Sequence, residues 1–260
     1  MELLKRVILA VIFIPIILGI FYFSGIALLS FLALIVFFQM FELREMFFQK
    51  GVIIPIILLP TSILIFVLSS LFGTKEIVFS LLLIFFIVLG NDLFRNQLEG
   101  SISRVSTSIF SIVYSAVFLS SVYRISAFEN GHLLILSLLV LIWITDTFAY
   151  FTGLLFGKHR GVFKASPKKS VEGFLGGLFF ALIGGFVIYK FADIPIEKSL
   201  AAAICAGIFG QLGDLFESML KRDAGVKDSS NLLPGHGGVL DRFDSLLIAA
   251  PVYYLVLSLK

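Results

Sequence analysis

Residues 133–156 read LLILSLLVLIWITDTFAYFTGLLF, an apolar run that contains a single charged residue, Asp146. A helix of about 20 apolar residues matches the hydrocarbon thickness of a bilayer. Inside lipid a segment must satisfy its own backbone hydrogen bonds, which favours a helix over a strand. The stretch therefore predicts a membrane-spanning helix with a carboxylate inside it. One narrow face of that helix carries Asp146, Tyr150, Gly153 and Gly157.

The rest of the chain has the same character. Of its 260 residues, 59% are hydrophobic and 14% are charged, which is outside the range of soluble domains. The lone cysteine, Cys205, lies in an apolar run and argues against a disulfide-built secreted scaffold. The chain is predicted to be an all-α, polytopic membrane protein with about nine spans. These spans cover roughly residues 7–23, 26–41, 52–72, 77–89, 109–123, 133–156, 173–191, 200–220 and 239–259.

The basic residues indicate an orientation and not a nucleic-acid surface. A net charge of +3 is small for this length, and the bases fall between apolar runs, so nucleic acid is not an expected partner. With nine spans, 15 of the 20 Lys and Arg residues lie on the side of the N-terminus. The positive-inside rule then predicts a cytoplasmic N-terminus, an outer C-terminus and cytoplasmic loops at 158–172 and 221–238.

The two halves of the chain differ in chemistry. From Trp143 onward, acidic residues, glycines and basic residues occur within or beside the apolar runs. The earlier runs are almost entirely Leu, Ile, Val and Phe. We therefore expect residues 1–130 to form a transmembrane scaffold with dimer or lipid contacts. Residues 131–260 are expected to form the catalytic region.

Acidic side chains recur in the last two predicted spans. A carboxylate within a span costs about 2.5 to 3.5 kcal/mol on insertion scales, so it needs a partner or a function. Asp214, Glu217 and Lys221 share one helix face, and Asp241 and Asp244 share another. Oxygen ligands without a histidine or cysteine cluster suit Mg²⁺ bound to substrate phosphates. The alternative is that each acid pairs with a base and holds two helices together.

The basic loop before the seventh predicted span suits a phosphate group. Residues 166–170 read SPKKS, and Ser170 is a typical N-cap. Lys168 and Lys169 would then lie just before a helix N-terminus, which itself favours an anion. Positive-inside topology alone is the alternative explanation of these charges.

A glycine-rich turn precedes the last predicted span. Residues 234–238 read PGHGG, which allows the backbone to approach a ligand closely. His236, Gly237 and Gly238 are therefore candidates for phosphate contact. A turn histidine without a chemical role is the alternative for His236.

Two long stretches carry a family resemblance. Residues 218–228 read SMLKRDAGVKD and residues 233–244 read LPGHGGVLDRFD, and together they resemble the signature of phosphatidate cytidylyltransferases, also called CDP-diacylglycerol synthases. Shorter blocks at 146–150, 157–159 and 166–173 also resemble the family. The resemblance spans about residues 143–245.

The resemblance implies a dimeric enzyme of the bacterial inner membrane. Such an enzyme joins CTP to phosphatidic acid among the membrane lipids, releases pyrophosphate and forms CDP-diacylglycerol for phospholipid biosynthesis. It would use Mg²⁺, with a monovalent cation such as K⁺ as a second metal. Asp214 and Asp241 are the first candidates for metal ligands. Asp146, Asp223, Asp228 and Asp244 are the second, either as ligands or as anchors for the basic side chains.

Basic side chains would offset the charge that develops on the leaving pyrophosphate. The candidates are Lys168, Lys169, Lys221, Arg222 and Lys227. Two related enzymes are the nearest alternatives: a CTP-dependent polyprenol kinase and a cytidylyltransferase acting on archaeal lipids. A cation-coupled transporter, with the intramembrane acids as an ion path, is an alternative from another class.

Overall fold

The computed structural model describes residues 2–72, 74–233 and 237–259, with side chains described from residue 13 onward except at 74–77. Over these residues the chain forms helices and two isolated bridges, without a strand. The elements are α1 (Glu2–Phe23), α2 (Gly25–Gln49), α3 (Leu58–Leu71), α4 (Thr74–Arg95), α5 (Ser101–Ile112), η1 (Val113–Val117), α6 (Phe118–Ser126), α7 (Gly131–Phe156), α8 (Val171–Phe191), α9 (Ile196–Ile204), η2 (Cys205–Gly210), α10 (Gln211–Asp223) and α11 (Leu240–Ser258).

Two of the long helices contain a π-helical turn. Elements α5, η1 and α6 form one helix over Ser101–Ser126, and α9, η2 and α10 form another over Ile196–Asp223. The predicted spans 109–123 and 200–220 are therefore confirmed as single helices. A π turn inside an α-helix often lies at a functional site, and here η2 leads directly into α10.

The helices confirm a polytopic membrane protein. Six of the described helical segments are long and apolar enough to cross a bilayer. They are Gly25–Gln49, Val78–Arg95, Ser101–Ser126, Gly131–Phe156, Val171–Phe191 and Ile196–Asp223. They are accompanied by the shorter apolar α3, by α1, whose described side chains at Phe13–Phe23 are also apolar, and by the 19-residue α11.

The predicted third and fourth spans had the wrong bounds. Residues 52–57 are not helical, and α3 begins only at Leu58. Pro55 has no backbone N–H and disfavours helical geometry at the residue before it, and the helix begins only after it, at Leu58. In contrast, α4 has 22 residues and extends the predicted 77–89 in both directions.

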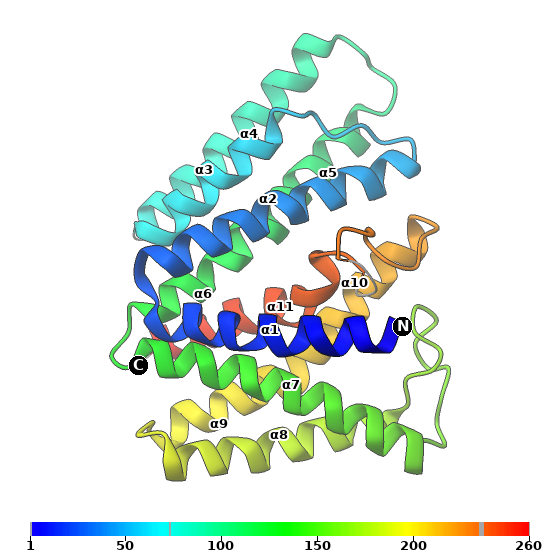
Figure 1. Ribbon diagram of the computed structural model, residues 1–260. Coiled ribbons are helices and arrows are strands. Elements are labelled where there is room, and N and C mark those ends of the chain that lie inside the picture. Colours follow the sequence, from blue (N-terminus) through cyan, green and yellow to red (C-terminus); the bar gives the residue numbers. More distant parts are fainter. Residues whose placement is uncertain (1, 73, 234–236, 260) are drawn as a thin grey trace.

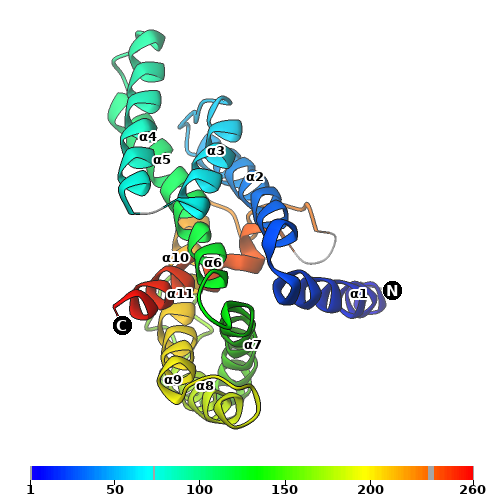
Figure 2. The ribbon, with the colours of Figure 1, turned by 90° about the vertical axis from the view of Figure 1, so that its left-hand side faces the viewer.

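Figure 1 shows the two termini at opposite sides of the bundle, as an odd number of spans requires. The loop 157–170 and the segment 224–233 lie on the side of the N-terminus. In Figure 2, α4 and α5 lie at one edge, α7, α8 and α9 lie at the other, and α6, α10 and α11 lie between them. The two polar loops therefore meet at one end of the molecule, where α10 ends and α11 begins.

Small residues bring the backbones of α7 and α8 together, as their sequence predicts. A Cβ atom added at Gly173 would lie 2.8 Å from the Ala149 carbonyl oxygen, and one at Gly177 would lie 3.0 Å from that of Thr145. The amide of Gln211 then donates to the Phe174 carbonyl oxygen at 3.0 Å, which joins α10 to α8. These contacts hold the first turn of α8 beside α10.

Candidate active site

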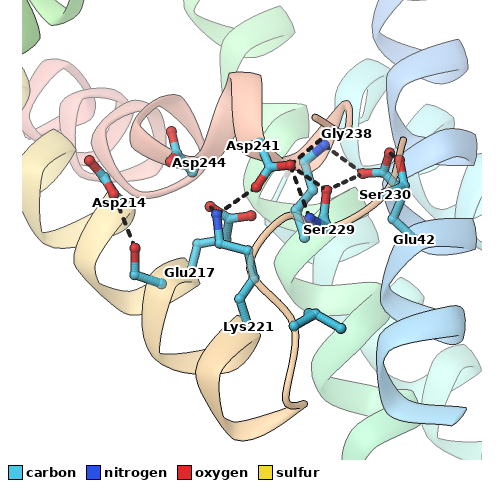
Figure 3. Close-up of polar contacts among 12 residues, drawn as sticks. Glu42, Asp214, Glu217, Lys221, Ser229, Ser230, Gly238, Asp241 and Asp244 are labelled. Carbon is cyan, nitrogen blue, oxygen red and sulfur yellow. Dashed lines mark hydrogen bonds and ion pairs between the residues drawn. The ribbon is translucent and has the colours of Figure 1, made fainter. Parts of the chain in front are cut away.

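Acids and lysines from three elements gather where α10 meets α11 (Figure 3). Lys221 of α10 lies at the centre of this cluster, with 11% of its side chain exposed. Its Nζ atom lies 2.8 Å from Glu217 Oε2 and 2.5 Å from Asp241 Oδ1. The Glu217 side chain is fully buried, and its Oε1 atom has no hydrogen-bond partner among the described residues. One ammonium group thus serves two carboxylates, and one carboxylate oxygen stays available.

The second oxygen of Asp241 binds the loop before α11. Asp241 Oδ2 accepts hydrogen bonds from the backbone N–H of Ser229 at 3.0 Å and of Gly238 at 2.7 Å, and Ser229 Oγ lies 2.9 Å away. Gly237 has a φ of +81°, and a Cβ atom there would lie 2.7 Å from Asp241 Oδ2. The glycines therefore allow the carboxylate to approach the backbone. The Gly238 N–H, expected to meet a phosphate, donates to Asp241 instead.

Asp214 is bound by the loop before α8. Its Oδ2 atom lies 2.6 Å from Lys169 Nζ, and both side chains are about one third exposed. Ser170 Oγ accepts a hydrogen bond from the Gly173 N–H at 3.0 Å, which confirms the predicted N-cap of α8. The cap fixes where the loop ends, and so it directs Lys169 toward α10.

Asp244 and Asp146 complete the acidic cluster. The nearest turns of α10 and α11 touch, because a Cβ atom added at Gly213 would lie only 2.6 Å from the Asp244 carbonyl oxygen. Asp146 of α7 is exposed and forms no hydrogen bond or ion pair with the described residues of the cluster, but it lies close enough to Asp244, Asp214 and Lys169 to feel their charges. Tyr150, predicted to share the face of Asp146, is 66% exposed at the protein surface. Only part of that α7 face therefore turns toward the cluster.

The remaining candidates lie at the edge of the cluster or outside it. Asp223 forms an exposed ion pair with Lys50 at 2.9 Å. Arg222 donates to the Val226 carbonyl oxygen at 3.2 Å. Lys168 and Lys227 are exposed on the two polar loops. His236 lies outside the described residues.

Glu42 of α2 is a site residue that sequence reasoning missed. Its side chain is fully buried against the start of α11 (Figure 3). Glu42 Oε1 accepts from Ser230 Oγ at 2.6 Å and from the Val239 N–H at 2.8 Å. Oε2 accepts from the Leu240 N–H at 2.7 Å and lies 3.0 Å from Ser229 Oγ. The sequence contained one indication of this role, a glutamate directly after the predicted span 26–41. The prediction ended the helix before Glu42, whereas α2 continues to Gln49.

Tyr114 of η1 is a second missed residue. Its ring packs against Phe110 and against Phe216, with ring centroids 5.3 and 5.7 Å apart. The hydroxyl is buried without a partner among the described residues, and it interacts electrostatically with Glu217 and with the neighbouring acids. Nothing in the apolar context of residues 109–123 distinguishes this tyrosine from a packing residue.

The described donor set of the cluster suits Mg²⁺ better than zinc, since the side chains that the structure describes there are carboxylates without a histidine or cysteine. Among the described residues, no three such side chains converge as a ready metal site. Mg²⁺ commonly needs only one or two carboxylates, because substrate phosphates and water complete its shell. The unpartnered Glu217 Oε1 and the Asp214 carboxylate fit that requirement.

Two cavities of the described structure lie away from this cluster. One, of about 650 Å³, is lined by residues 51–53 and by residues of the α4–α5 turn such as Arg95 and Arg104. The other, of about 430 Å³, lies at the opposite end of the bundle near Glu129, Tyr189 and Lys198. The site is therefore identified by its charged groups and not by an enclosed cavity.

Comparisons with known proteins agree along the whole chain. The model of the cytidylyltransferase family matches residues 4–260. A phosphatidate cytidylyltransferase of Staphylococcus saprophyticus is 36% identical over 264 residues, which cover 98% of this chain and 97% of the relative. The phosphatidate cytidylyltransferases of Staphylococcus haemolyticus and Staphylococcus aureus are 35% and 34% identical, with the same coverage.

Proposed function

Since the chain belongs to the cytidylyltransferase family, we propose that it transfers the CMP group of CTP to phosphatidic acid, forming CDP-diacylglycerol and pyrophosphate. The observation that carries this proposal is the cluster of Asp214, Glu217, Asp241 and Asp244 around Lys169 and Lys221. Such a cluster suits a reaction between two phosphate groups, because it offers both cations and sites for a metal. A polytopic membrane fold also suits a lipid substrate, which lies in the same bilayer.

The reaction needs charge neutralisation more than a strong base. A phosphate monoester has a second pKa near 6, so the phosphate of phosphatidic acid is largely dianionic at neutral pH. One of its oxygens attacks the α-phosphorus of CTP and forms a P–O bond. The bond from the α-phosphorus to the bridging oxygen breaks, and the electron pair leaves with pyrophosphate.

Lys169 and Lys221 are proposed to exchange partners during this reaction. Without substrate they bind Asp214 and Asp241, which neutralises carboxylates that would otherwise repel a triphosphate. When phosphate oxygens enter, the two ammonium groups can turn toward them. The released carboxylates, with Asp244 and Glu217 beside them, would hold Mg²⁺. When bound, Mg²⁺ polarises the phosphoryl oxygens and orients the triphosphate.

The polar loops are proposed to extend this cationic surface. Lys168 and Lys227 are exposed at the same end of the molecule, where they can attract the anionic nucleotide or lipid headgroups. The excess of Lys and Arg at this end supports a cytoplasmic active site and N-terminus, in the inner membrane of a bacterium. The role of Asp223 as a metal ligand stays a prediction, because its ion pair is with Lys50 and not with a residue of the cluster.

Three finer predictions also stay proposals. The homodimer follows from the resemblance, and cysteine cross-linking in membranes tests it. The monovalent cation is tested by replacing K⁺ with Na⁺ or Li⁺ in the assay. The third prediction divides the chain into two regions, in which residues 131–260 carry most of the catalytic side chains. Glu42 of the N-terminal region binds the start of α11 in the C-terminal region.

The decisive experiment supplies the purified protein with phosphatidic acid, Mg²⁺ and each nucleoside triphosphate in turn. CTP-dependent formation of CDP-diacylglycerol with one pyrophosphate per lipid is the expected result, and Asp214→Asn should abolish it. Release of CDP with a polyprenol substrate would identify a lipid kinase instead. Cation flux in liposomes without nucleotide, together with no lipid product, would identify a transporter.

A further inference from the structure

We propose that Glu42 is a positioning residue, which fixes Ser229, Ser230 and the start of α11 and through them the carboxylate of Asp241. The inference rests on the proposed function, in which Asp241 exchanges Lys221 for the metal. Glu42 lies on α2, whereas every acid in the predicted site lies in the C-terminal half. The two halves are therefore joined at the site itself.

The surroundings of Glu42 indicate a specific function. The carboxylate is fully buried, and its hydrogen-bond partners among the described residues are neutral: two backbone N–H groups and two serine hydroxyls. A buried carboxylate is costly unless hydrogen bonds and local dipoles compensate for its charge. The N–H groups of Val239 and Leu240 lie at the N-terminal end of α11, where backbone N–H groups have no acceptor within the helix. The helix dipole also favours an anion at this end.

One side chain links Glu42 directly to Asp241. The Ser229 hydroxyl lies 3.0 Å from Glu42 Oε2 and 2.9 Å from Asp241 Oδ2. In addition, the Ser229 N–H donates to Asp241 Oδ2 at 3.0 Å. A displacement of Ser229 therefore changes two of the contacts that hold Asp241. Ser230, by contrast, donates to Glu42 and forms no hydrogen bond with Asp241 among the described residues.

The space around Gly238 shows how tightly this arrangement is packed. A Cβ atom added there would overlap the Ser229 hydroxyl and would lie 2.6 Å from Glu42 Oε1. Glu42 and Ser229 thus fill the volume that any larger residue would need. The Gly238 N–H can then reach Asp241 Oδ2 at 2.7 Å.

Replacing Glu42 by glutamine tests the role of the carboxylate with little change of volume. Each oxygen of Glu42 faces one backbone N–H and one hydroxyl. In either orientation the new amide therefore turns its own N–H₂ group toward a backbone N–H of α11. The hydroxyl can rotate and accept, but the backbone N–H cannot. One backbone N–H at the start of α11, that of Val239 or of Leu240, thus loses its acceptor.

We expect Glu42→Gln to lower kcat by about 10- to 100-fold, the range seen when a residue supporting a metal ligand is changed. The KM for phosphatidic acid should stay within about twofold. Hydrogen exchange at the amides of residues 237–245 should accelerate, while exchange in α7 and α8 should stay as in the wild type. The matched control is Glu45→Gln on the same helix, because Glu45 is about half exposed and pairs only with Arg44.

Two serine variants separate positioning from general stabilisation. Ser229→Ala removes contacts to both carboxylates. Ser230→Ala removes a contact to Glu42 and the bond that Ser230 Oγ accepts from the Leu232 N–H, and it leaves the contacts of Asp241 in place. Positioning predicts that Ser229→Ala lowers kcat at least fivefold more than Ser230→Ala does at equal melting temperature. Equal kcat values in the two variants, or near-normal kcat in folded Glu42→Gln, would overturn the proposal.

The result also separates this proposal from the proposed function. If the Glu42→Gln variant is active and the Asp241→Asn variant is inactive, the positioning role of Glu42 is refuted and the proposed reaction still stands. If the wild type forms no CDP-linked lipid, the proposed function fails. Hydrogen exchange in Glu42→Gln then still decides whether Glu42 fixes the loop: unchanged exchange at residues 237–245 would refute it.

Discussion

Adding one methyl group at Gly213 should separate the two helices that carry the acidic cluster. The new Cβ atom would lie 2.6 Å from the Asp244 carbonyl oxygen, whereas ordinary contacts begin at 3.4 Å. The partner atom belongs to the backbone and cannot rotate away. Helix α10 must therefore move relative to α11 by about 0.8 Å, the difference between these two distances.

The cost of this shift can be estimated for stability and for catalysis. Overpacking costs about 1 to 3 kcal/mol, while alanine improves helix propensity over glycine by about 1 kcal/mol. The net loss of folding free energy should therefore be about 0 to 2 kcal/mol. A misplacement of about 1 Å can reduce a rate about 100-fold. We expect Gly213→Ala to lower kcat about 30- to 100-fold in a protein that still folds.

Gly210→Ala is the matched control, since Gly210 lies one turn earlier in the same helix. Its φ and ψ are helical, and the nearest atom to an added Cβ is Ser245 Cβ at 3.6 Å, an ordinary contact. This variant gains the same helix propensity without the clash, so its kcat should stay within twofold. The assays are pyrophosphate release at saturating substrates and thermal unfolding in detergent. Equal kcat values for the two variants would refute the argument.

Three further changes test individual contacts. Ser170→Ala removes the N-cap of α8 and should cost about 0.5 to 2 kcal/mol in thermal unfolding; an unchanged melting temperature would contradict the cap. Tyr114→Phe removes a buried hydroxyl without a described partner and should raise stability by about 1 kcal/mol, so a loss of stability would reveal a hidden partner. Asp223→Asn breaks only an exposed ion pair with Lys50, and activity and stability should stay near wild type, the latter within about 1 kcal/mol. Abolished activity would instead support Asp223 as a metal ligand.

The sequence predicted the membrane helices well because their signal is local. An apolar run of sufficient length must be helical in lipid, whatever its neighbours are. The exceptions have local causes as well, such as Pro55, which disfavours helical geometry at the residue before it. The N-cap at Ser170 was predictable for the same reason, since capping depends on a few adjacent residues.

The pairing of charges could not be predicted, because it depends on which helices become neighbours. Lys221 is near Glu217 in sequence, but its contact with Asp241 requires α10 to lie beside α11. Glu42 is separated from Leu240 by most of the chain, and only the fold shows that one binds the other. Without spatial information, a lone glutamate at the end of an apolar run is indistinguishable from a residue at the membrane boundary.

The two lysine bridges also suggest the order in which the site opens. Each bridge joins two elements: Lys169 holds the loop before α8 to α10, and Lys221 holds α10 to α11. A phosphate group must therefore compete with bonds that keep the site together. Lys169 is 35% exposed and Lys221 only 11%, so an arriving triphosphate meets Lys169 first. Release of the loop at Asp214 would then precede release of Asp241, which Ser229 and Gly238 continue to hold in place.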